Sequence, residues 1–245
     1  MLHRAIALLL GVVFACAAAT QARADRYQFS DISPGTYQAG DQMRFSLDHY
    51  QNGFVLRFAG QPEVFVLYAN FGSLGGRVLQ YDSGAIAIQV AGWGGMTLYT
   101  DDHPEGLPTS RVGDSSPPAP AQISMQQMQN AADDETAHLS YVRGLHIGFF
   151  ADQNIVSDNG VRALAFDAME NAARGIDRFT ANSAGRATFG QRVVSVRLQI
   201  SDKPYIKLTD RVLIVTFNPR TGYFGRASSR AIAAALGKMF AIPIN

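Results

Sequence analysis

The stretch Asp82-Ser83-Gly84-Ala85-Ile86-Ala87-Ile88-Gln89-Val90-Ala91-Gly92-Trp93-Gly94-Gly95-Met96-Thr97-Leu98-Tyr99-Thr100 contains two short apolar runs joined by a glycine-rich turn. Turn residues bound each run, which predicts strands over 85–91 and 96–99. The glycines around Trp93, the only tryptophan, predict a bulge or a tight hairpin with Trp93 in the core or at its rim. No Lys-Ser or Lys-Thr follows, so the turn lacks the signature of a phosphate-binding loop.

The chain before this hairpin also has a β pattern. Met43–His49 alternates apolar and polar residues, and Asn52-Gly53 is a hairpin dipeptide. Three further runs bring the predicted strands to six, at 43–49, 54–58, 63–68, 77–81, 85–91 and 96–99. Short connections between strands favour an antiparallel meander or a small barrel, and we assign it to residues 25–113.

A different pattern begins after the proline-rich stretch 114–120, which we interpret as a linker. Apolar residues at helical spacing predict a helix from Ile123 to Phe149, which Gly144 could bend or split. The same spacing over residues 161–179 predicts a second helix, capped by Ser157 or Asp158. Strands at 194–200, 205–208 and 211–217 and a last helix starting at Ser228 or Ser229 complete an α-α-β-β-β-α domain over 121–245. The predicted fold class is α+β.

The first 24 residues have the pattern of a signal peptide. Met1–Arg4 carries positive charge, Ala5–Ala15 is apolar, and Ala22-Arg23-Ala24 fits a signal-peptidase site. Cleavage near Ala24 predicts a periplasmic or secreted protein. Val13–Cys16 loosely resembles a lipobox, so lipid anchoring at Cys16 is the alternative.

Cleavage at Ala24 would leave a mature chain without cysteine. Disulfides, thiolate catalysis and cysteine-type zinc sites would then be excluded. No later apolar run reaches the roughly 20 residues that span a bilayer, so we expect no transmembrane segment in the mature chain.

Charge divides the chain into two unlike halves. Residues 25–140 hold five arginines and 13 acidic residues, a net charge of −8, whereas residues 141–245 hold 14 basic and seven acidic residues, a net charge of +7. Opposite charges would allow the halves to dock on each other. The alternative is a basic face for anionic envelope material such as lipid phosphate. No nucleic-acid-binding motif accompanies the basic residues, so nucleic acid is not an expected partner.

Two groups of residues are candidates for catalysis or metal binding. Asp101-Asp102-His103 could act as acid and base or bind a divalent metal. Asp134 and His138, four residues apart, would share one face of a helix, but a metal site needs at least three ligands. We therefore predict no metal or other cofactor. No Gly-x-Ser-x-Gly elbow, Ser-x-x-Lys pair or His-Glu-x-x-His helix is present.

A third group could bind an anion. Arg220, Arg226 and Arg230 surround Gly222–Gly225 just before the last predicted helix. Arginines beside the backbone donors of a helix N-terminus can hold a phosphate or carboxylate, whereas solvated arginines around a capped turn are the alternative.

Several short motifs resemble those of an uncharacterised family of secreted alphaproteobacterial proteins with the same two-part layout. The motifs are Gly35-Thr36-Tyr37, Arg57-Phe58 with Pro62-Glu63-Val64, Gly94–Thr100, Pro104-Glu105-Gly106 and Arg226–Arg230. The resemblance implies location and layout, and it implies no activity.

The sequence therefore predicts an exported, non-enzymatic binding or interaction module of the cell envelope. Its expected partner is an anionic envelope component or another envelope protein. The alternative is a metal-dependent or acid/base hydrolase that uses Asp101, Asp102 and His103.

Overall fold

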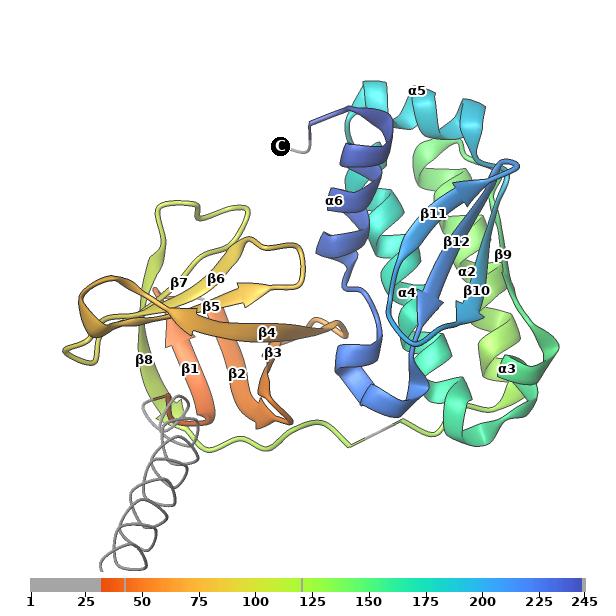
Figure 1. The fold of residues 1–245 in the computed structure, drawn as a ribbon. Coiled ribbons are helices and arrows are strands. Elements are labelled where there is room, and N and C mark those ends of the chain that lie inside the picture. The colour runs from red at the N-terminus through yellow and green to blue at the C-terminus, as the bar shows by residue number, and fades with distance from the viewer. Residues whose placement is uncertain (1–31, 42, 120, 244–245) are drawn as a thin grey trace, which may run out of the picture. The chain divides into compact units, whose positions relative to one another are not determined.

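The computed structural model describes residues 32–41, 43–119 and 121–243, so the predicted signal peptide and Cys16 lie outside the described residues. Residues 32–34 contain no helix or strand. Within the compact unit Gly35–Asn245, a β-barrel is followed by helices and a mixed sheet (Figure 1). The predicted α+β class is confirmed. Of the two architectures predicted for the β half, an antiparallel meander or a small barrel, the structure shows the barrel.

The barrel contains eight antiparallel strands. Each strand pairs with its neighbour in the chain, and the first strand also pairs with the eighth, which closes the sheet. The strands are β1 Gly35–Ala39, β2 Met43–Tyr50, β3 Gly53–Phe58, β4 Val64–Phe71, β5 Arg77–Tyr81, β6 Ile86–Val90, β7 Met96–Leu98 and β8 Leu107–Gly113. The six predicted strands correspond to β2 to β7, and β1 and β8 were not predicted.

The two missed strands close the barrel. Strand β8 contains Pro108, whose missing N–H normally argues against a strand, and most of its residues are exposed or half-buried. Pro108 lies opposite Thr97 of β7. On its other side β8 pairs with β1 through a bulge between Thr36 and Tyr37.

Aromatic side chains fill one end of the barrel interior. The rings of Tyr37 and Phe45 stack with centroids 5.4 Å apart, and Phe58 meets Phe65 edge to face at 6.1 Å. Phe65 then packs on Tyr81 at 5.4 Å. Eight-stranded barrels are just wide enough for side chains to fill, and this one is packed in that way.

The glycine-rich turn around Trp93 forms the predicted tight hairpin between β6 and β7. The N–H of Ala91 donates to the carbonyl oxygen of Gly95 at 2.8 Å, and the N–H of Gly94 donates to Ala91 at 2.9 Å. Trp93 lies at the tip of this hairpin and is exposed, so it belongs to the rim and not to the core.

The C-terminal half is a layer of helices on a four-stranded mixed sheet with strand order β11-β12-β10-β9. Strands β9, β10 and β12 run parallel, and β11 is antiparallel to β12. The elements are α2 Met125–Arg143, β9 Gly148–Ala151, α3 Gln153–Ser157, α4 Asn159–Thr180, α5 Ser183–Arg192, β10 Ser195–Ile200, β11 Ile206–Thr209, β12 Val212–Phe217, the 3-10 turns η2 Pro219–Gly225, and α6 Ser229–Phe240.

The first helix of this half is shorter than predicted. Helix α2 ends at Arg143 because Gly144 adopts the left-handed conformation (φ 66°), and its N–H caps the carbonyls of Leu139 and Ser140. Phe149, which has helical spacing from α2, instead belongs to strand β9. The predicted caps Asp158 and Ser228 are confirmed for α4 and α6. Helices α3 and α5 were not predicted.

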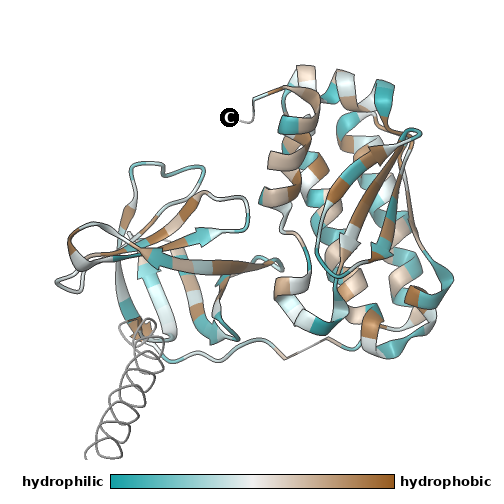
Figure 2. Ribbon diagram, viewed as in Figure 1, coloured by the Kyte–Doolittle hydropathy of each residue, from teal (hydrophilic) through white to brown (hydrophobic). Residues whose placement is uncertain are grey.

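Alternation along β10 shows which face of the sheet is covered. Val196 and Leu198 are buried in the layer's apolar core, whereas Arg197 is exposed. Figure 2 shows hydrophobic residues along β10 and β12 and on the helices beside them. Helix α4 approaches α6 at Gly175, where an added Cβ would lie 2.6 Å from Ile232. In the part of the chain that the structure describes, no helix combines the length and hydrophobicity needed to cross a membrane.

Candidate functional site

One end of the barrel holds a pocket of about 560 Å³. In an antiparallel barrel, alternate connections lie at the same end. The β1–β2, β3–β4 and β7–β8 connections therefore meet here, and all three contribute to the pocket. We call this pocket the barrel mouth; it is lined by Ala39, Gly40, Asp41, Met43, Arg44, Phe58, Ala59, Gln61, His103 and Leu107.

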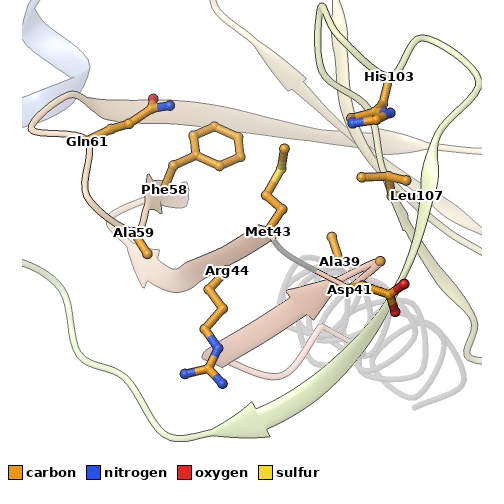
Figure 3. Close-up of a pocket in the computed structure, with 10 residues that line it drawn as sticks. Ala39, Asp41, Met43, Arg44, Phe58, Ala59, Gln61, His103 and Leu107 are labelled. Atoms are coloured by element: carbon orange, nitrogen blue, oxygen red, sulfur yellow. The ribbon is translucent and has the colours of Figure 1, made fainter.

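The barrel mouth has an apolar floor and a polar rim. Figure 3 shows the side chains of Phe58 and Met43 pointing toward the same space, with Leu107 on its other side. The ring of Phe58 is held between Phe45 and Phe65, so this wall belongs to the packed aromatic core. The polar residues of the rim are Asp41, Arg44, Gln61 and His103.

The same end of the barrel binds the start of helix α6 through two carboxylates. Glu63, just before β4, accepts hydrogen bonds from the N–H and the hydroxyl of Ser229, at 2.8 and 2.7 Å. Asp82, just after β5, accepts from the N–H and the hydroxyl of Ser228, at 2.7 and 2.5 Å. Carboxylates at a helix N-terminus satisfy free N–H groups and favour the helix dipole. The barrel therefore supplies the acceptors that this helix start needs.

Arg226 is the second link between the two halves. Its side chain is buried at 1% exposure, and its Nη2 donates to the carbonyl oxygen of Val64 at 2.8 Å. Its Nε is paired with Asp167 of helix α4, and its guanidinium lies 5.3 Å from the ring centre of Tyr223. A buried guanidinium with these partners stabilises one arrangement of barrel and layer.

Burial shifts the pKa of the acidic groups at this contact. It raises the pKa of Glu63, although hydrogen bonds from Ser229 act in the opposite direction. Burial likewise raises the pKa of Asp82, against the hydrogen bonds from Ser228. Tyr81, beside them, has its pKa raised to about 12, again chiefly by burial.

Next to this contact lies a charged cleft of about 640 Å³. It is lined by the loop 61–63 of the barrel and by side chains of helices α2 and α4, among them Asp134, Glu135, His138 and Arg174. Burial, followed by the charge of Glu170, raises the pKa of Glu135. The predicted pair Asp134 and His138 is thus brought together at this cleft, with both residues exposed. No group of three or more His, Cys, Asp or Glu residues that could hold a metal ion occurs in the described residues.

The three residues of Asp101-Asp102-His103 have different surroundings. The carboxylate of Asp101 is bound by Arg178 at 2.6 Å and by Arg230 at 2.9 Å. Asp102 is exposed, and Nδ1 of His103 lies 3.1 Å from Glu105. Of the three, only His103 lines the barrel mouth.

The three arginines proposed for anion binding are also separated by their surroundings. Arg220 is exposed, whereas Arg226 is buried in the contact between barrel and layer. Arg230 is paired with Asp101, and its guanidinium lies 4.4 Å from the ring centre of Tyr81. Two of the three positive charges are therefore already matched by carboxylates of this chain. Complementary charges do meet where the acidic and basic halves touch.

The structure adds residues that the sequence did not indicate. The sequence pattern predicts Glu63 as the start of a strand and Asp82 as part of a turn. A carboxylate directly before the apolar run Val64–Leu67 was the one available signal for Glu63, because a charge next to buried strand residues needs a partner. The floor of the barrel mouth, formed by Met43, Phe58 and Leu107, carried no such signal.

These features define a class of protein: a closed eight-stranded barrel with a pocket at its mouth, held by carboxylates and a buried arginine to an α/β layer. The chain belongs to the family described as "Domain of unknown function (DUF4908)", whose model matches residues 17–236. This match confirms the predicted membership of an uncharacterised family that covers most of the chain. Comparisons with curated proteins and with solved structures found no match.

Proposed function

We propose that this protein is an exported binding module of the cell envelope that holds a small amphipathic molecule in the barrel mouth. Export rests on the signal-peptide pattern of residues 1–24. The observation that carries the binding function is the pocket itself, with its apolar floor and polar rim.

The size and lining of the barrel mouth suit a small ligand. Ligand pockets typically measure about 300–1,000 Å³ and combine apolar walls with a few polar groups that fix orientation. At about 560 Å³ the barrel mouth falls in this range.

The lining also indicates the chemistry of the ligand. An alkyl or aromatic portion would lie on Phe58, Met43 and Leu107. Gln61 and His103 lie on the polar rim, where an amide and an imidazole can hydrogen-bond a polar head group, whereas the side chain of Arg44 points away from Phe58 and Met43 and donates through Nε to Gln38 at 2.9 Å. The expected ligand therefore has an apolar body and a polar head.

The hydrolase alternative would require Asp101, Asp102 and His103 to act on one substrate. General acid–base catalysis needs both groups within hydrogen-bond reach of the reacting atoms. The side chain of Asp101 is directed to two arginines, and that of His103 to Glu105. This separation favours the binding module.

Obstructing the barrel mouth should weaken binding. Ala59 is exposed at the rim, and Ala59→Trp adds a large side chain there without altering the core. We expect the affinity for dansyl-labelled undecanoic acid, measured by its fluorescence, to fall at least about tenfold, which corresponds to roughly 1.4 kcal/mol.

Ser73→Trp is the matched control, because Ser73 is also exposed but lies in the β4–β5 connection at the other end of the barrel. This variant should bind the probe like the parent chain. Absence of binding to the parent, or equal affinities for Ala59→Trp and Ser73→Trp, would refute the proposed site.

A further inference from the structure

The end of the barrel opposite the mouth exposes three large apolar side chains. They are Phe71 at 69% exposure, Leu74 at 88% and Trp93 at 82%, and we call them the apolar tip. Phe71 ends β4, Leu74 lies in the short 3-10 turn Ser73–Gly75, and Trp93 lies in the β6–β7 hairpin. Scattered exposed apolar residues are ordinary, but these three lie at the ends of two neighbouring hairpins, at one end of the barrel.

The two loops lie against each other, so the three side chains belong to one surface. A Cβ added to Gly92 would lie 2.7 Å from the carbonyl oxygen of Leu74. A Cβ added to Gly76 would lie 2.5 Å from the carbonyl oxygen of Val90. Glycine at both positions permits this close approach.

Leu74 has an unfavourable backbone conformation that contacts of its own side chain do not offset. Its φ of 53° and ψ of 40° lie in the left-handed region, which leucine rarely adopts. Such a conformation costs free energy, and a side chain that is 88% exposed recovers little of it through contacts within the chain. Asn or Gly would adopt this conformation more readily, yet the loop presents leucine to the surroundings.

The charge of the tip differs from that of the barrel as a whole. Residues 35–113, which form the barrel, hold seven acidic residues and four arginines, a net charge of −3, but 70–78 and 89–97 contain one charged residue, Arg77. The guanidinium of Arg77 lies 4.9 Å from the ring centre of Phe71, and its Nη1 donates to the carbonyl of Gly76 at 3.1 Å. The tip thus places a positive charge directly behind three apolar side chains and includes no carboxylate.

From this arrangement we propose that the apolar tip inserts into the interface of an anionic lipid bilayer. Tryptophan, phenylalanine and leucine are the side chains that enter this region, and a cation behind them would meet lipid phosphates. Protruding single side chains fit a deformable lipid surface, whereas a protein partner would need a pocket for each. Because the tip and the mouth lie at opposite ends of the barrel, insertion would leave the mouth open.

The chain contains its own reporter, since Trp93 is the only tryptophan. On addition of vesicles of phosphatidylglycerol and phosphatidylcholine to the full chain, Trp93 emission should shift to shorter wavelength. Lipids brominated on their acyl chains should quench it. Vesicles of phosphatidylcholine alone should give a weaker response. Trp93 reports on the tip itself, so attachment through the apolar residues 5–15 would not imitate this result.

Leu74→Asn tests the tip with little risk to the fold, because asparagine tolerates the left-handed conformation. It should lower vesicle affinity at least about tenfold, the effect of removing one buried leucine side chain. Tyr141→Gln is the control, because it removes an apolar residue that is 93% exposed on helix α2, and it should bind vesicles like the parent.

Three results would overturn the proposal. The first is Trp93 emission that does not respond to anionic vesicles. The second is a Leu74→Asn variant that binds vesicles as well as Tyr141→Gln. The third is an emission shift that follows protein concentration without lipid, which would make the tip a contact between copies of the chain.

Discussion

Replacing Arg226 with alanine is expected to lower the free energy of unfolding by about 3–5 kcal/mol, the usual effect of breaking a buried ion pair. Arg226 is buried, and it donates to Asp167 and to the backbone of Val64. Its loss would leave a partly buried carboxylate and a buried carbonyl without their donor. Urea unfolding followed by circular dichroism would measure the change.

Arg220→Ala provides the comparison, because Arg220 lies six residues earlier and is exposed. Its effect should stay within about 0.5 kcal/mol, as for ordinary surface substitutions. Equal stabilities of the two variants would show that Arg226 does not hold barrel and layer together.

Glu63→Ala should have the second-largest effect, a loss of about 3 kcal/mol. Both donors of Ser229, its N–H and its hydroxyl, bind this carboxylate, and both are buried. An unsatisfied buried donor costs about 1–3 kcal/mol, and alanine would leave two. Glu63→Gln keeps an acceptor for the N–H and should lose less stability; if alanine and glutamine had equal effects, the capping role of Glu63 would be wrong.

The pH dependence of these variants gives an independent readout. Burial raises the pKa of Glu63, so the folded protein keeps a proton on this carboxyl at pH values where the unfolded chain has released it. The wild type therefore loses stability relative to Glu63→Gln as the pH rises through that raised pKa. Lowering the pH toward the ordinary pKa of a glutamate should raise the free energy of unfolding of the wild type relative to that of Glu63→Gln.

Much of the fold could be predicted because local patterns determine it. Asn52 and Asp82–Gly84 do lie in connections between strands, although Gly53 already belongs to β3, and Asp158 and Ser228 cap the helices expected of them. Strand β8 was missed because Pro108 and its exposed residues give no apolar alternation. Strand β9 was missed because Phe149 has helical spacing from α2, while the left-handed Gly144 ends the helix before it.

The sequence indicated only that the two halves carry opposite net charges and could dock, and not which residues form the contact between barrel and layer. The opposite charges of the two halves were visible, but their partners lie far apart in the chain. Glu63 binds a serine 166 positions away, and Arg226 binds the carbonyl of Val64, 162 positions away. Sequence patterns of a few residues carry no information on such pairings. For this reason Arg226 looked like a surface arginine.

The barrel mouth was not visible in the sequence for the same physical reason. Its lining comes from three segments, 39–44, 58–61 and 103–107, which meet only when β1 closes on β8. Within each segment Met43, Phe58 and Leu107 look like ordinary core residues. Their shared exposure to one cavity is a property of the closed barrel.

The most direct test of ligand binding in the barrel mouth is a nuclear magnetic resonance titration of the chain labelled at its methionine methyl groups. Met43 lines the barrel mouth, whereas Met128 and Met169 line a separate pocket of about 430 Å³ in the layer. Adding undecanoic acid should shift the Met43 resonance and leave those of Met128 and Met169 in place. Shifts at Met128 and Met169 with Met43 unchanged, or no shift at any methionine, would contradict the account.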